Sequence, residues 1–157
     1  MRIVLDSNIL VRSFVKSQGL ARELLLAILS GEHTLILSHE ILYEVARVLR
    51  YPRLMMVHGQ NEEAIYNYTD WLRDAAEIIA LNPLQLAPIR DRHDIFVLQT
   101  ALNGETDVLC TGDRDFFEPP ASIFLAGKNS KDTVGCFFFH ISVTFMGLTP
   151  ENHIFKK

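Results

Sequence analysis

The chain has 157 residues, of which 48% are hydrophobic and 22% are charged. This length and composition indicate one globular domain with a sizeable core, and no apolar stretch reaches the length that a membrane-spanning helix requires. The formal net charge of -4 argues against a protein that coats nucleic acid through a bulk positive field.

Apolar runs alternate with amphipathic segments from the N-terminus to about Thr111. The apolar runs predict strands at residues 2–5, 34–37, 77–81 and 107–111. The amphipathic segments predict helices at residues 19–30, 38–50, 61–76 and 91–103. Ser38 is suited to cap the second of these helices, and Tyr51-Pro52 ends it. Strands that alternate with helices in this way predict a parallel sheet covered on both faces.

The C-terminal part of the sequence is less regular. Residues 123–125 predict an edge strand, and residues 136–146 form an apolar segment rich in Phe and β-branched residues. This segment is compatible with a final strand. A run this apolar is also a candidate for an interface, in a dimer or with a partner protein.

Four acidic residues follow the end of a predicted strand or lie on a predicted helix. They are Asp6, Glu44, Asp94 and Asp113. The carboxyl ends of parallel strands open onto one crevice, so acids from separate segments can converge there. Packed carboxylates repel one another and lose hydration unless a cation neutralises them, so this pattern predicts a divalent-metal site. Without these four acids the formal net charge would rise from -4 to 0.

For Asp6 and Asp94, a role in metal binding can be compared with a structural role in the adjoining helix. Asp6 follows an apolar run at the rim of the predicted sheet, and its simplest other role is the N-cap of the next helix. Asp94 shares a helical face with Leu98 and Ala101, where an unpaired charge would be costly. The helix dipole favours an acid in the first turn, but by too little to offset burial.

The other acids have different contexts. Glu44 lies in mid-helix at the edge of an apolar stripe and has no evident structural role, whereas Glu40 is explained by the helix dipole in the first turn. Asp113 follows Thr111-Gly112 at the end of a strand, where glycine lets the backbone turn sharply. Asp115 is a reserve ligand or the cap of a short turn.

Other chemistries fit the sequence less well. The six histidines are scattered, His93 is most simply a surface residue, and the spacing that zinc ligands need is missing. A phosphatase with an aspartyl nucleophile would be expected to carry a second Asp at the position of Asn8. A dinucleotide enzyme would need a glycine fingerprint after the first strand, where Asp6-Ser7-Asn8 stands.

Two further features bear on substrate and compartment. Basic residues lie mostly within a few positions of the acids, so local phosphate contacts are possible. They are Arg12, Lys16, Arg47, Arg50, Arg53, Arg90, Arg92 and Arg114.

Cys110 and Cys136 have no ligand spacing and suggest reduced, buried thiols. With no secretory signal before the first strand, we expect a cytoplasmic protein.

Four segments, taken in order, resemble the PIN-domain nucleases. They are residues 4–8 (Val-Leu-Asp-Ser-Asn), residues 38–45 (Ser-His-Glu-Ile-Leu-Tyr-Glu-Val), Asp94 ahead of Val97-Leu98, and residues 111–116 (Thr-Gly-Asp-Arg-Asp-Phe). Each motif alone is weak, but four at compatible spacing make a specific match. Within the family the chain is similar to toxins of toxin-antitoxin systems. The resemblance covers about residues 1–125, which we expect to form a PIN-like nuclease domain.

The resemblance implies a three-layer α/β/α, Rossmann-like fold with a central, mainly parallel sheet of four or five strands. It implies that Mg²⁺ or Mn²⁺ is held by Asp6, Glu44, Asp94, Asp113 and Asp115, with Ser7, Asn8 and Thr111 in support. The implied activity is hydrolysis of single-stranded RNA by a metal-activated water. The implied partners are an antitoxin and, commonly, a second copy of the chain.

The sequence departs from the family in two places. Ile95 stands where many relatives carry a second acid after the position of Asp94, and the family pattern is lost beyond about Gly127. Residues 126–157 are therefore an atypical C-terminal segment that we expect to pack on the same domain or in an interface. The alternative function is a PIN-like module that binds RNA or protein without cutting. The four acids weigh against it, because a binding surface for a polyanion gains nothing from converging negative charge.

Overall fold

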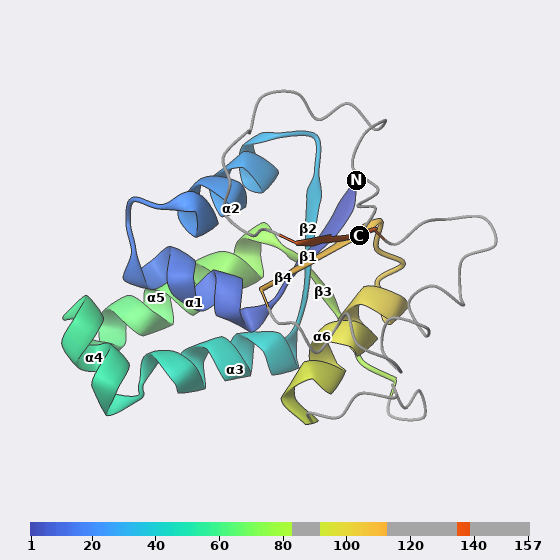
Figure 1. Cartoon of the computed structure of the whole chain (residues 1–157). Helices are drawn as coiled ribbons and strands as arrows, with labels where there is room; N and C mark the ends of the chain where they lie inside the picture. Colours follow the sequence, from blue (N-terminus) through green and yellow to red (C-terminus); the bar gives the residue numbers. More distant parts are fainter. Residues whose placement is uncertain (83–91, 113–134, 139–157) are drawn as a thin grey trace.

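The computed structural model describes residues 1–82, 92–112 and 135–138, the last of these and residues 92–94 by their backbone alone (Figure 1). The strands in these ranges are β1 (Arg2–Leu5), β2 (Thr34–Ser38), β3 (Glu77–Ile79), β4 (Val108–Thr111) and β5 (Gly135–Phe138). The helices are α1 (Ser7–Val15), α2 (Leu20–Ser30), α3 (His39–Leu49), α4 (Pro52–His58), α5 (Glu62–Ala75) and α6 (Arg92–Asn103). This alternation of strands and helices is the α/β class that the sequence predicts.

The five strands form one sheet in the order β3-β2-β1-β4-β5, and every neighbouring pair is parallel. The first strand of the chain is therefore the middle strand of the sheet. Its neighbours are β2, in the register Val4↔Ile36, and β4, in the register Leu5↔Cys110. The prediction of a central parallel sheet of four or five strands is confirmed.

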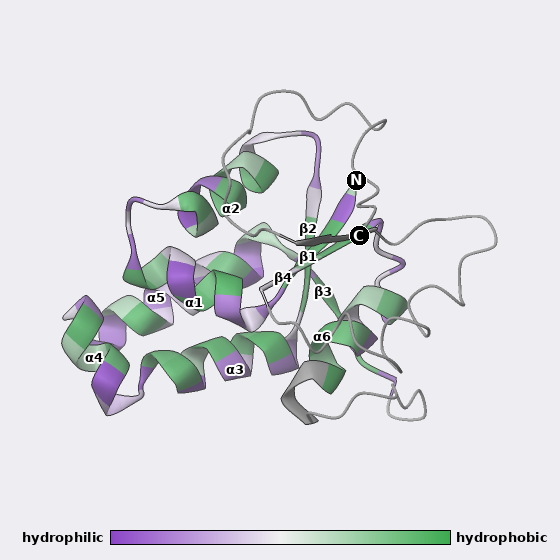
Figure 2. Cartoon of the chain, in the orientation of Figure 1, coloured by the Kyte–Doolittle hydropathy of each residue, from purple (hydrophilic) through white to green (hydrophobic). Residues whose placement is uncertain are grey.

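The apolar character of the three central strands follows from burial on both faces. Helices α1, α2 and α5 lie to one side of the sheet and α6 lies to the other (Figure 1). Strands covered on both faces lose the alternation of polar and apolar residues that a half-exposed strand shows. Ile3–Leu5, Leu35–Leu37 and Val108–Cys110 are accordingly buried throughout. Figure 2 shows this hydrophobic centre, with hydrophilic residues on the outward sides of the helices.

Capping residues set the beginnings of several helices. The side chains of Asp6, Ser38 and Asn61 accept hydrogen bonds from backbone N–H groups in the first turns of α1, α3 and α5, respectively. Helix α3 ends at Leu49, before Tyr51-Pro52, as the sequence predicts. Pro52 then begins α4, a helix that the sequence analysis did not anticipate. Proline suits the first helical position because its fixed φ matches the helix and its missing N–H is not needed there.

Glycine allows a close approach at the end of α6. A Cβ atom on Gly104 would lie 2.7 Å from the side chain of Ile36 and 2.9 Å from the carbonyl oxygen of Thr100. The glycine therefore lets the end of α6 sit directly against β2, consistent with the contacts of α6 with β1 and β2. This packing sets the position of α6 relative to the middle of the sheet.

Three expected strands compare differently with the structure: one is shorter, one lies outside the described residues and one begins as a strand. Strand β3 ends at Ile79 and is shorter than the predicted strand 77–81, and its side chains are at most half-buried. The predicted strand at residues 123–125 lies outside the described residues. Strand β5 includes the first residues of the apolar segment 136–146 and pairs with β4 at the edge of the sheet. Among the helices that the structure describes, none is long and apolar enough to cross a membrane.

Candidate functional site

Asp6 lies at the carboxyl end of the middle strand, in the loop between β1 and α1. Its side chain is buried, with 1% of the residue exposed. Its backbone N–H donates to the carbonyl oxygen of Cys110 at 2.9 Å, which extends the pairing of β1 with β4 by one step. Thr111, the last residue of β4, is thereby brought beside Asp6. Residues far apart in the sequence thus meet at this edge of the sheet.

The Asp6 carboxylate is held by hydrogen bonds from three side chains. Thr111 Oγ1 donates to Oδ2 at 2.7 Å, Ser7 Oγ donates to Oδ1 at 3.1 Å, and Asn8 Nδ2 donates to Oδ2 at 3.5 Å. The backbone N–H of Asn8 also donates to Oδ1, at 3.4 Å, which is the N-cap interaction. Asp6 is therefore both a helix cap and a buried acid, and the three predicted supporting residues all contact it.

No cation balances the charge of Asp6 among the residues that the structure describes, since no Lys, Arg or His forms an ion pair with it. Burying a carboxylate without a counter-charge is costly even when it is hydrogen-bonded. A hard divalent cation would supply that charge, and the carboxylate and hydroxyl oxygens here are the ligands that Mg²⁺ and Mn²⁺ prefer. The donor chemistry of the site therefore fits such an ion.

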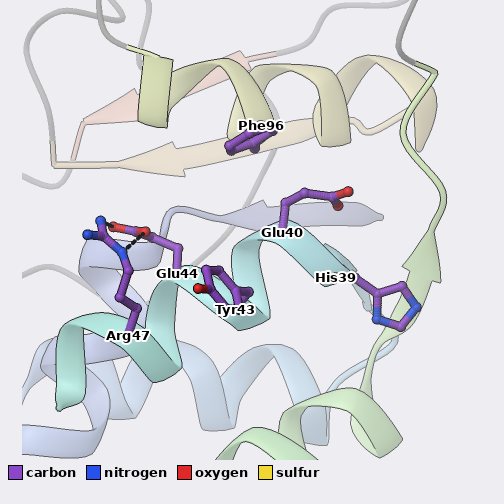
Figure 3. Close-up of a pocket in the computed structure, with 6 residues that line it drawn as sticks. All are labelled: His39, Glu40, Tyr43, Glu44, Arg47 and Phe96. Atoms are coloured by element: carbon purple, nitrogen blue, oxygen red, sulfur yellow. Dashed lines mark hydrogen bonds and ion pairs between the residues drawn. The ribbon is translucent and has the colours of Figure 1, made fainter.

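Glu44 lies on α3, at the edge of that helix's buried stripe, and its carboxylate has a partner. Arg47 donates from Nη2 to Oε1 at 2.7 Å and from Nε to Oε2 at 2.9 Å, a bidentate pair one turn apart (Figure 3). These hydrogen bonds raise the pKa of the Arg47 guanidinium. The expectation that Glu44 has no structural role was wrong. The spacing of Glu44 and Arg47, an i,i+3 pair, is the signal that indicates the ion pair.

The structure describes the remaining predicted ligands in less detail. Asp94 is in the first turn of α6, whose N-terminal end points to the carboxyl edge of the sheet because its C-terminal end leads into β4. Asp113 and Asp115 lie outside the described residues. Within the described part of the chain, no three His, Cys, Asp or Glu side chains come together as a metal site. The convergence of all the acids stays a prediction.

A groove lies between α3 and α6, with a volume of about 550 Å³. Figure 3 shows Glu40, Tyr43, Glu44 and Arg47 along one side of α3, with Phe96 of α6 opposite them. His39 completes the lining. Tyr43 and Phe96 were not predicted as site residues, although an aromatic residue on the polar face of a helix is a sequence signal of such a surface.

The basic residues near the acids fall into two groups. Arg47 and Arg50 are paired, with Glu44 and Glu62 respectively. Arg12 is exposed on α1 and forms no ion pair with any described residue. Its Nη1 atom lies 3.7 Å from the position that a Cβ atom on Gly112 would take, directly after β4. A guanidinium thus sits beside the same strand end as Thr111.

An all-parallel sheet with helices on both faces belongs to the Rossmann-like class of α/β proteins, and here the buried Asp6 lies at the carboxyl end of the middle strand. Within that class, the family model of the PIN domain matches residues 2–115, so the chain belongs to the PIN domain family. Members of this family are generally nucleases, and they generally use divalent metal ions. The family prediction from the sequence motifs is confirmed.

The fold is also similar to a solved structure. VapBC2 from Rickettsia felis, bound to a DNA fragment from its promoter, superposes with a TM-score of 0.57 at 14% sequence identity. The similarity covers 88% of this chain and 100% of that chain. At this identity the likeness shows the fold alone. A comparison with curated proteins found no match.

Proposed function

We propose that the chain is a metal-dependent endoribonuclease that hydrolyses phosphodiester bonds of single-stranded RNA. The observation that carries this proposal is the Asp6 carboxylate, which is buried, held by three side chains and left without a neutralising cation in the described part of the chain. Membership of a family whose members are generally nucleases supports it. A module that only binds RNA would not benefit from a buried, uncompensated acid.

The proposed ligands of Mg²⁺ or Mn²⁺ are Asp6, Glu44, Asp94, Asp113 and Asp115. When bound, such an ion polarises a phosphodiester oxygen and makes a coordinated water more acidic. The protein's own contribution is to fix the acids: Thr111, Ser7 and Asn8 keep the Asp6 carboxylate in one orientation. Arg12 is available for a phosphate oxygen, because it is exposed at the same strand ends and forms no ion pair within the described ranges.

We also propose that this activity belongs to the toxin of a cytoplasmic toxin-antitoxin pair, and that the chain forms a homodimer. The resemblance of the sequence motifs to such toxins supports an antitoxin partner, as does the shared fold with VapBC2. Residues 1–125 are then the nuclease domain. The apolar character of residues 136–146, within the C-terminal segment 126–157, supports an interface beyond the strand β5.

The test is cleavage of a labelled single-stranded RNA in Mn²⁺ or in EDTA. We expect cleavage in Mn²⁺, none in EDTA, and a loss of roughly 100-fold or more in Asp6→Asn, which keeps the shape of the side chain but removes its charge. Asp70→Asn is the matched control, because Asp70 is an exposed acid on α5 that forms an ion pair with Arg73 and lies outside the proposed site. Cleavage that persists in EDTA, or that survives Asp6→Asn, would refute the mechanism.

A second readout does not depend on catalysis. Mn²⁺ should raise the melting temperature of the native chain in a concentration-dependent manner, because it binds the folded state, and this rise should shrink in Asp6→Asn. Glu44→Gln provides an independent variant at the second acid. If Mn²⁺ raises the melting temperature of both variants by as much as it raises that of the native chain, neither acid is a ligand.

A further inference from the structure

The groove between α3 and α6 exposes two aromatic rings from opposite walls. Tyr43 is 72% exposed and Phe96 is 40% exposed, and Figure 3 shows both of them over the same space. Neither ring belongs to the buried core. Exposed aromatic area of this kind is unfavourable in water and becomes favourable when a flat apolar surface covers it. The groove is therefore built to receive a planar group.

The charges along the groove disfavour a phosphate as the group that lies between Tyr43 and Phe96, beside Glu40. The Glu44 carboxylate is neutralised by Arg47, whereas Glu40 forms no ion pair with a described residue. The net charge that these three side chains present is therefore negative, and a phosphodiester placed among them would be repelled. An uncharged planar ring meets no such repulsion and can stack on Tyr43 or Phe96.

The position of the groove relates it to the acids. Glu44, a proposed metal ligand, lines the groove, and Phe96 lies two residues after Asp94 on α6. A strand of RNA whose phosphate reaches a metal ion held by Glu44 has a neighbouring nucleotide within the same groove, which Tyr43 and Phe96 also line. Aromatic side chains beside a backbone-binding site are the usual way in which proteins hold single-stranded nucleic acid.

We propose that this groove binds one nucleobase of the RNA, stacked against Tyr43 and Phe96, next to the phosphate that the acids engage. The proposal rests on the proposed function, since it names how the same site holds its single-stranded substrate. Stacking accepts any base, because every base has a π face. The two rings would thus set the position of the strand without selecting its sequence.

The test uses a short single-stranded RNA that contains a fluorescent purine analogue, whose emission is quenched when it stacks on an aromatic ring. Binding is measured in Mn²⁺ with a form of this RNA whose phosphodiester linkages resist hydrolysis, so that the acids can carry their metal ion, and cleavage is measured separately with the ordinary RNA in Mn²⁺. We expect quenching with the native chain, and roughly 5- to 100-fold weaker binding with loss of quenching in Tyr43→Ala and in Phe96→Ala. Tyr43→Phe keeps the ring and should bind as the native chain does.

The matched control is Tyr66→Ala, which removes another exposed tyrosine, on α5, that does not line the groove. Tyr43 is mostly exposed, so Tyr43→Ala should keep the native melting temperature. Phe96 is 40% exposed and buries part of its ring, so the melting temperature of Phe96→Ala is measured alongside, and binding is compared where that variant is fully folded. Quenching and affinity unchanged in both alanine variants would overturn the proposal, as would binding of the native chain without quenching.

The two proposals can fail separately. Quenching that depends on Tyr43 and Phe96, without cleavage in Mn²⁺, would leave the base site standing and reject the nuclease. Cleavage in Mn²⁺ with an unchanged KM in Tyr43→Ala and Phe96→Ala would support the nuclease and reject the base site. If the native chain neither binds the hydrolysis-resistant RNA nor cleaves the ordinary RNA in Mn²⁺, both proposals are wrong.

Discussion

At the scale of single residues, Asp6 combines two roles that the sequence presented as alternatives. It caps α1 through the backbone N–H of Asn8, and its other oxygen accepts a short hydrogen bond from Thr111. A cap at the surface would be solvated, but this carboxylate is buried at the edge of the sheet. Its orientation therefore depends on a residue of another strand as well as on its own helix.

The contribution of Thr111 can be measured with Thr111→Val, which replaces the hydroxyl by a methyl group of similar size. Removing the donor leaves Asp6 Oδ2 buried with one hydrogen bond fewer, so we expect the free energy of unfolding to fall by about 1 to 3 kcal/mol. Urea denaturation in EDTA measures it without interference from metal binding. Thr111→Ser, which keeps the hydroxyl, should lose clearly less. Equal stability of the valine and native proteins would show that the hydrogen bond contributes nothing.

At the scale of secondary-structure elements, a buried pair of hydroxyl groups joins α5 to α1. Tyr68 of α5 and Ser13 of α1 have their oxygens 2.7 Å apart, and each lies 2.8 Å from the carbonyl oxygen of Leu10. Each hydroxyl has one proton, so one donates to the other and the second donates to Leu10. This local network satisfies polar groups that the helix packing would otherwise leave unpaired.

The same network makes stability sensitive to alkaline pH. Burial raises the pKa of Tyr68 to about 12, above the ordinary value of 10.0. The stabilisation from its neutral hydroxyl is complete below pH 10 and is lost as the pH rises through 12, because the unfolded chain releases the proton first. The free energy of unfolding should therefore fall by about 2 kcal/mol between pH 10 and 12 on account of Tyr68 alone.

Tyr68→Phe isolates this contribution, because it keeps the ring but has no group to titrate. Its stability in chemical denaturation should depend less steeply on pH above 10 than that of the native chain. Tyr66→Phe, at an exposed tyrosine on the same helix, should leave the slope unchanged. Parallel pH profiles for the native and Tyr68→Phe proteins would contradict the assignment.

At the scale of the whole molecule, the two ends of the strands, here called the carboxyl edge and the amino edge of the sheet, carry different kinds of charge. The carboxyl edge holds Asp6 without a cation in the described part of the chain, whereas the amino edge holds a complete ion pair. Arg2 of β1 donates from both terminal nitrogens to Glu77 of β3, at 2.8 and 2.9 Å, and from Nε to the carbonyl oxygen of Gly104. The Arg2–Glu77 ion pair and the buried Asp6 carboxylate thus lie at opposite ends of the strands.

The ion pair at the amino edge should make stability depend on acidic pH. The hydrogen bonds from Arg2 lower the pKa of Glu77. The stabilisation is therefore present above the ordinary glutamate pKa and is lost as the pH falls through the lowered value. Glu77→Gln should be less stable than the native chain at neutral pH, by a difference that shrinks in acid. Denaturation series across this pH range would show it.

The control for Glu77→Gln is Glu32→Gln, at an exposed acid that forms no ion pair with a described residue. Its stability should follow the native profile at every pH. Because both members of the pair at the amino edge are partly exposed, salt should weaken the effect of Glu77→Gln. A difference between Glu77→Gln and the native chain that persists undiminished at low pH would show that packing, and not charge, causes it.

The sequence predicted what depends on local patterns. Period and capping signals located β1, β2, α3 and the end of α3 at Tyr51-Pro52, and strand-helix alternation predicted the parallel sheet. The bond from Thr111 to Asp6 could not be read in this way, because it joins residues 105 positions apart through the pairing of β1 with β4. The Glu44–Arg47 pair, by contrast, was visible as an i,i+3 spacing.

The buried face of α2 shows a second limit of sequence patterns. Helical periodicity in the sequence places Leu20, Leu24, Ala27 and Ile28 on one face, but Leu25 and Ile28 are the buried residues in the structure. An apolar helix such as α2 has hydrophobic residues on several sides, so periodicity alone does not fix its rotation. The neighbouring α1 and β2 decide which side turns inward.

The order of the strands has a consequence for how the protein is made. The middle strand β1 leaves the ribosome first, but its neighbour β4 is synthesised about a hundred residues later and only then can pair with it. Until that moment Asp6 lacks the hydroxyl of Thr111 that holds it. A nascent or prematurely terminated chain would therefore carry Asp6 without this support, and the proposed nuclease site would be complete only after β4 has been translated.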